Sequence, residues 1–89
     1  MEDHTFELYN RAGVSLTGEI SGGCLRLCSE VWGEYDSGVC YELSKEATDK
    51  LFSLLSFEEF VDMCRKQNLL GLLRFLDENS IEIRVIPVF

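Results

Sequence analysis

The sequence predicts an α+β fold, in which a four- to five-stranded, mostly antiparallel sheet carries two or three helices on one face. Three observations predict it. Apolar and polar residues alternate through most of the first 43 positions, which is the period of a strand with one buried face. The apolar period lengthens to about 3.6 residues over 44–79, as in amphipathic helices. Alternation returns in the last ten residues, so the N-terminal meander gains a C-terminal strand.

The segment TFELY at 5–9 predicts the first strand, with Phe6 and Leu8 facing inward and the turn-like NRAG following. VSLTGEI at 14–20 and CLRLCSEV at 24–31 predict the next two strands, because each places its apolar residues on one parity.

The pair Gly22-Gly23 predicts a two-residue hairpin turn between these strands, because glycine supplies the positive φ angles that such turns need. The resulting register gathers the apolar residues on one side of the sheet. It also sets Glu19 opposite Arg26 on the other side, which is a favourable cross-strand pair. The other opposed pairs are Ser21 with Cys24, Ile20 with Leu25, Gly18 with Leu27, and Val14 with Val31.

GVCYEL at 38–43 predicts a fourth strand, with Val39, Tyr41 and Leu43 inward. Ser44 is then the expected N-cap of a first helix. The apolar stripe expected on that helix consists of Ala47, Leu51, Leu54 and Leu55.

Ser56 and Glu59 predict a capping box at the start of a second helix. Its apolar stripe is Phe57, Phe60, Val61 and Cys64. LLGLLRFLDEN at 69–79 predicts a third helical segment with Leu69, Leu72, Leu73 and Leu76 on one side, ending at Asn79. The final strand, within 80–89, should turn Ile81, Ile83 and Val85 inward, and Pro87 confines its end to a sheet edge or a tail.

The composition predicts one domain over residues 1–89 with its own core, since 46% of the residues are hydrophobic. The chain has sixteen acidic and eight basic residues, and the resulting net charge of -8 repels nucleic-acid phosphates and anionic lipid. We therefore expect no direct nucleic-acid or membrane binding. The first ten residues lack the basic and apolar regions of a signal peptide, so a soluble, cytoplasmic protein is expected.

Three of the four cysteines lie within 17 positions. Cys24 and Cys28 are four residues apart on one strand, roughly 13 Å, which is too far for a disulfide or for two ligands of one zinc ion. Cys40 is expected to be a diagonal neighbour of Cys28. In a reducing compartment four free thiols are expected, with a Cys28–Cys40 bridge and a metal site as the alternatives. Cys64 is expected in the core.

We expect no catalytic residues, no cofactor and no metal, and hence no enzyme. The one histidine, His4, lies near the N-terminus and far in sequence from every cysteine, so no cysteine has a base to activate it. GEISGG leads into a strand and has no following lysine, so it does not form a phosphate-binding loop. The acids Glu58 and Asp62 lie near the start of a helix and off its apolar stripe, which is typical of a solvated face.

The segment EVWGEYDSG between two strands is the candidate partner-binding surface, because it combines large aromatic residues with acids on a hairpin connection. The alternative is that its tryptophan covers the edge of the sheet. With one acid from the next strand, the candidate residues are Glu30, Trp32, Glu34, Tyr35, Asp36 and Glu42.

The leading hypothesis is a small, acidic, non-enzymatic interaction module that blocks a basic surface of a partner protein. Inhibitors, immunity proteins and anti-CRISPR-type inhibitors of phage-defence nucleases often have this size and charge, and their acids can stand in for nucleic-acid phosphates. The alternatives are a small enzyme or ligand-binding domain with a site between sheet and helices, and a homodimer joined at the last strand or at VIPVF.

Overall fold

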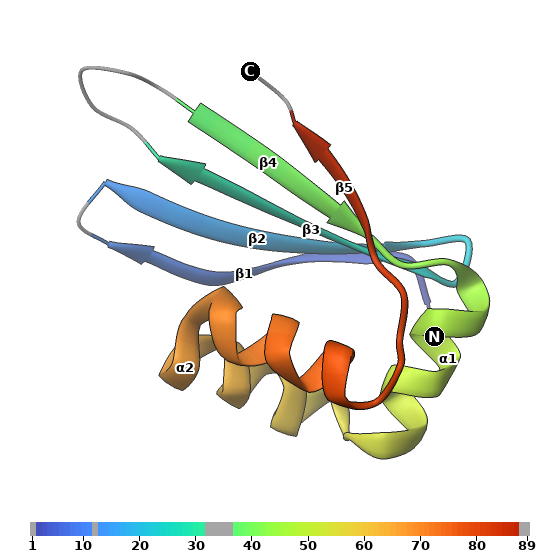
Figure 1. Cartoon of the computed structure of the whole chain (residues 1–89). Helices are drawn as coiled ribbons and strands as arrows, with labels where there is room; N and C mark the ends of the chain where they lie inside the picture. The colour runs from blue at the N-terminus through green and yellow to red at the C-terminus, as the bar shows by residue number, and fades with distance from the viewer. Residues whose placement is uncertain (1, 12, 32–36, 88–89) are drawn as a thin grey trace.

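The computed structural model describes residues 2–11, 13–31 and 37–87, which form one antiparallel sheet with two helices on one face (Figure 1). This confirms the predicted α+β class. The strand order is β1-β2-β3-β4-β5, so the sheet follows the order of the chain. The elements are β1 (His4–Arg11), β2 (Val14–Ser21), β3 (Cys24–Val31), β4 (Ser37–Glu42), α1 (Lys45–Leu54), α2 (Phe57–Glu78) and β5 (Arg84–Pro87).

The β2–β3 hairpin has the predicted register. Gly22 and Gly23 form its turn with φ angles of 59° and 80°, which residues with a side chain rarely adopt. Ile20 lies opposite Leu25, and Glu19 lies opposite Arg26. One face of the hairpin is therefore apolar and the other polar.

A β-bulge interrupts the pairing of β1 with β2 at Leu8. Glu7 pairs with Thr17, but Tyr9 pairs with Leu16, so Leu8 is an extra residue in β1. Both Leu8 and Tyr9 pack on the core as a result. On the other strand, Gly18 is required by close approach, because a Cβ atom there would overlap the ring of Phe6.

The last strand is shorter and less buried than predicted. It begins at Arg84, while Ile81 is buried before the strand starts. Val85 lies opposite Tyr41 and so points to the inner face as predicted, but it is 57% exposed there and does not belong to the core. The helices pack closest to β1 and β3, so the far edge strand receives no cover from them. Pro87 lies in this edge strand, as predicted.

Both helices begin where predicted. The Ser44 side chain accepts a hydrogen bond from the Ala47 N–H, and Ser56 forms a reciprocal capping box with Glu59. The apolar stripe predicted for α1 was wrong at Leu54, because this side chain is 48% exposed. The second and third predicted helical segments are one continuous helix of 22 residues, because a single glycine lowers helix stability by only about 1 kcal/mol and does not break the helix.

The core lies between the helices and the inner face of the sheet. Phe60, Leu51 and Cys64 from the helices are fully buried, as are Leu16 and Leu25 from the strands. Val61 and Leu73 were also expected in the core, but both are only partly buried, and of the two Val61 packs against the core. Within the described residues, neither helix has the length and apolar character needed to span a membrane.

Candidate functional site

A row of alternating charges crosses the sheet on the face that the helices leave open. The register places Glu19 of β2 opposite Arg26 of β3, Arg26 opposite Glu42 of β4, and Glu42 opposite Arg84 of β5. Residues directly opposed in a sheet point to the same face. We call these four residues the charge row. Its order across the sheet is negative, positive, negative, positive.

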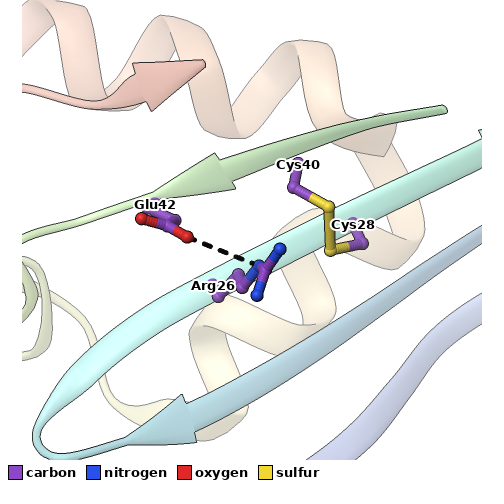
Figure 2. Close-up of a disulfide and its surroundings, with 4 residues drawn as sticks. All are labelled: Arg26, Cys28, Cys40 and Glu42. Atoms are coloured by element: carbon purple, nitrogen blue, oxygen red, sulfur yellow. Dashed lines mark ion pairs between the residues drawn. A yellow bond between two sulfur atoms is a disulfide. The ribbon is translucent and has the colours of Figure 1, made fainter. Parts of the chain in front are cut away.

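Arg26 and Glu42 form an ion pair within this row. Arg26 Nε lies 3.6 Å from Glu42 Oε1, and their side chains are 46% and 37% exposed. Figure 2 shows both side chains on the front of the sheet, with the helices behind it. An ion pair this exposed contributes at most about 1 kcal/mol to stability. It therefore orients the two side chains more than it holds the fold together.

Next to the charge row, Cys28 and Cys40 form a disulfide between β3 and β4 (Figure 2). The expectation of four free thiols is therefore wrong for this pair. The two residues are directly opposed in the register, not diagonal as expected, and their Cα atoms are 4.1 Å apart, well inside the ~7 Å limit for a disulfide. The register brings the two sulfur atoms close together, and an expectation based on a reducing compartment does not include this proximity.

The other two cysteines are free, and their surroundings differ. Cys24 is partly exposed at the start of β3. Cys64 is completely buried, and desolvation raises the pKa of its thiol to about 12. Cys64 is therefore a neutral core residue, as predicted, and cannot act as a thiolate near neutral pH.

A pocket of about 470 Å³ lies where the charge row meets the β2–β3 turn. All four residues of the charge row line it, together with Ser21 and Cys24. Carboxylates and guanidinium groups side by side can bind a surface or a molecule that itself carries both charges. Among the residues that the structure describes, no cluster of three or more His, Cys, Asp or Glu side chains could hold a metal ion.

The predicted partner-binding residues are only partly described. Glu30 is half-buried in β3 on the open face, and Glu42 belongs to the charge row. Trp32, Glu34, Tyr35 and Asp36 lie outside the described residues.

The sequence reasoning missed Arg84 as a neighbour of Glu42. The parities of β3 and β4 could have revealed the Arg26–Glu42 pair. The position of β5, in contrast, depends on how far two helices and a connection carry the chain.

In comparisons with known proteins, no family model, no curated protein and no solved structure matches this chain.

Proposed function

We propose that this protein is a non-enzymatic interaction module that blocks a basic surface of a partner protein, as inhibitors and immunity proteins do. One observation carries the proposal. The disulfide ties β3 to β4 close to the acidic, aromatic segment 32–36 that joins them. A connection anchored on a cross-linked hairpin loses less conformational entropy on binding than a free loop does, which favours affinity.

The charge of the molecule supports a basic partner. Acidic residues outnumber basic ones by eight, and Arg26 and Lys66 already form ion pairs with Glu42 and Asp62. A partner surface rich in lysine and arginine would be attracted over a distance of about one Debye length, ~8 Å at physiological salt. When that surface normally binds nucleic acid, the acids of this protein take the place of the phosphates.

The residues proposed for contact have different roles. Trp32 or Tyr35 anchors the complex, because buried aromatic side chains contribute most to many interfaces. Glu34, Asp36 and Glu30 of β3 steer the encounter. Glu42 contributes less, because Arg26 already compensates its charge.

The first experiment identifies the partner by affinity capture from host lysate and mass spectrometry, followed by binding kinetics with the purified partner. Tyr35→Ala should raise the dissociation rate about thirtyfold, equivalent to ~2 kcal/mol, and leave the association rate unchanged. Glu34→Lys/Asp36→Lys should mainly slow association and flatten its dependence on salt.

A matched control separates local steering from total charge. Asp77→Lys/Glu78→Lys makes the same change in net charge in the last turn of α2, away from the end of β3 (Figure 1). Local steering predicts that this control associates at nearly the wild-type rate. The proposal fails when folded Tyr35→Ala and Glu34→Lys/Asp36→Lys variants bind the identified partner at wild-type rates.

The proposal needs the disulfide to be formed in the cell, which conflicts with the cytoplasmic location expected from the sequence. A reducing cytoplasm keeps most thiols reduced, whereas secreted and periplasmic proteins retain their disulfides. Alkylation of the protein during cell lysis, followed by mass spectrometry, gives the redox state of Cys28 and Cys40 in the cell. An oxidised pair in most molecules would contradict the cytoplasmic location.

A further inference from the structure

We propose that two copies of this chain associate through the open faces of their sheets, with the charge row as the contact that fixes their relative position. This inference goes beyond the proposed function and uses the open face, which shares only Glu30 and Glu42 with the residues proposed for partner contact. The open face carries polar and charged side chains on all five strands, and the helices cover only the opposite face (Figure 1). A partner for this face must match the order of its charges.

The charge row is complementary to itself. Its order is Glu19, Arg26, Glu42, Arg84 across four neighbouring strands. A two-fold axis parallel to the strands, between β3 and β4, turns a second copy over and reverses this order. Each residue then faces an opposite charge, with Glu19 facing Arg84 of the second copy and Arg26 facing its Glu42. Self-complementary contacts of this kind are what a two-fold interface requires.

The neighbouring row is uncharged. Cys28 and Cys40 lie beside the axis, with Thr17 of β2 and Ile86 of β5 on either side of them. The two-fold rotation lays the disulfide of one copy over the disulfide of the other. An uncharged centre beside a matched row of charges resembles the usual arrangement of interfaces, which have an apolar core and a polar rim.

The overlap of the two open faces is smaller than a typical interface. With the axis between β3 and β4, the strands β2 to β5 of the two copies overlap, and ~4.8 Å between strands with four to eight residues of ~3.3 Å each gives an overlap of about 19 by 13 to 26 Å. Typical specific interfaces bury ~800 Å² of accessible surface on each partner, so we expect a weak dimer. The net charge of -8 opposes association at low salt and is screened near physiological salt.

Charge reversal tests the order of the row. Glu19→Arg and Arg84→Glu each place two pairs of like charges in the dimer, so each variant should dimerise at least about tenfold more weakly than wild type in sedimentation experiments. Non-specific repulsion predicts a different result for Glu19→Arg, because this variant carries less negative charge and would associate more strongly. Circular dichroism shows whether each variant is folded.

Two combinations should restore association. The double variant Glu19→Arg/Arg84→Glu again has opposite charges at the two ends of its charge row, and it has the wild-type net charge. Its dimer dissociation constant should therefore lie within about threefold of the wild-type value. Mixing the two single variants should give a heterodimer, because the arginine at 19 then faces the glutamate at 84. Weak association of both combinations would overturn the proposal, since neither contains a like-charge pair between the two chains.

Cys24 offers an independent measurement of the geometry. In the proposed dimer the two Cys24 Cα atoms lie ~11 Å apart, given ~10 Å between packed sheets and ~4.8 Å between neighbouring strands. A short bismaleimide should therefore join two chains through Cys24, while the buried Cys64 does not react. Cys24→Ser should abolish the cross-link. A wild-type chain that stays monomeric at concentrations on the order of 1 mM, or a dimer that does not cross-link, overturns the proposal.

Discussion

Phe60 is the largest side chain that is completely buried, and it joins the two layers of the fold. It makes edge-to-face contacts with Phe6 of β1 and with Phe52 of α1. Phe60→Ala should therefore lower the free energy of unfolding by ~3 to 5 kcal/mol, measured by urea denaturation. Leu70→Ala is the matched control on the same helix, because Leu70 is 68% exposed, and it should cost under about 0.5 kcal/mol. Equal losses in both variants would contradict the position of the helical layer.

The disulfide makes a prediction about thiol number. Denatured protein without reductant should show two reactive thiols per chain, from Cys24 and Cys64, and four after reduction. Cys28→Ser/Cys40→Ser should lower the free energy of unfolding by ~2 to 3 kcal/mol, since the bridge closes a short loop in the unfolded chain. Cys24→Ser should leave it nearly unchanged. Four thiols before reduction would show that the bridge is absent.

The buried thiol of Cys64 predicts a loss of stability in alkali. Its pKa is raised in the folded protein from 9.0 to about 12 by desolvation. Below pH 9 the thiol is neutral in both states. Between pH 9 and 12 it ionises mainly in the unfolded chain, so stability falls by up to ~1.4 kcal/mol per pH unit from this group. Cys64→Ala should remove that part of the pH dependence. Comparing this variant with the wild type under identical conditions cancels the contributions of the other titrating groups. Identical slopes would contradict the burial of the thiol.

At the scale of elements, Thr48 fixes α1 to the sheet. Its Oγ1 accepts a hydrogen bond of 2.9 Å from the Leu25 N–H in a buried position, where β3 begins. Thr48→Val keeps the shape but leaves that N–H without its acceptor, which should cost ~1 to 3 kcal/mol of unfolding free energy. Thr17→Val on the open face is the control and should change stability by less than ~0.5 kcal/mol. Faster amide exchange at Leu25 in Thr48→Val would locate the effect, and an unchanged rate would contradict it.

The elements that the sequence predicts well are those specified by neighbouring residues. The register of β2 with β3 follows from Gly22-Gly23, and the helix starts follow from Ser44 and Ser56. The start of β5 does not follow from alternation, because Ile81 is buried in the core before the strand begins and its N–H donates to the Leu76 carbonyl at the end of α2. Tertiary packing decided that boundary.

The C-terminus of α2 and the bulge in β1 also could not be predicted from neighbouring residues. Ser80 adopts a φ of 55° after α2, and the Ile81 N–H donates to the Leu76 carbonyl, although glycine is the usual residue at such a position. The bulge at Leu8 is stabilised by Arg65, whose Nε donates to the Leu8 carbonyl across 57 positions of sequence. No local pattern predicts a contact of that range.

At the scale of the whole molecule, the sequence predicts how much charge there is but not its order in space. The acidic excess is a count, whereas the charge row needs the register of all four strands from β2 to β5. Of the candidate site, Glu30 and Glu42 can be placed on the open face. Arg84 joins Glu42 only because the two helices return the chain to the edge beside β4.

The order of the strands also implies an order of opening. The strands β1 to β4 pair with sequence neighbours, but β5 pairs with β4 across an intervening segment from 43 to 83. Closing a longer loop costs more chain entropy. The strand β5 adds only four residues, and three of them, Arg84, Val85 and Pro87, are exposed. In native-state hydrogen exchange, the β5 amides should therefore exchange through a local opening that β2 and β3 do not share. Equal protection from exchange in β5 and β3 would show that the sheet opens as one unit. Lower protection in β5 would mean that Arg84 leaves the sheet while the rest of the protein stays folded. Glu42 then loses Arg84 as its neighbour.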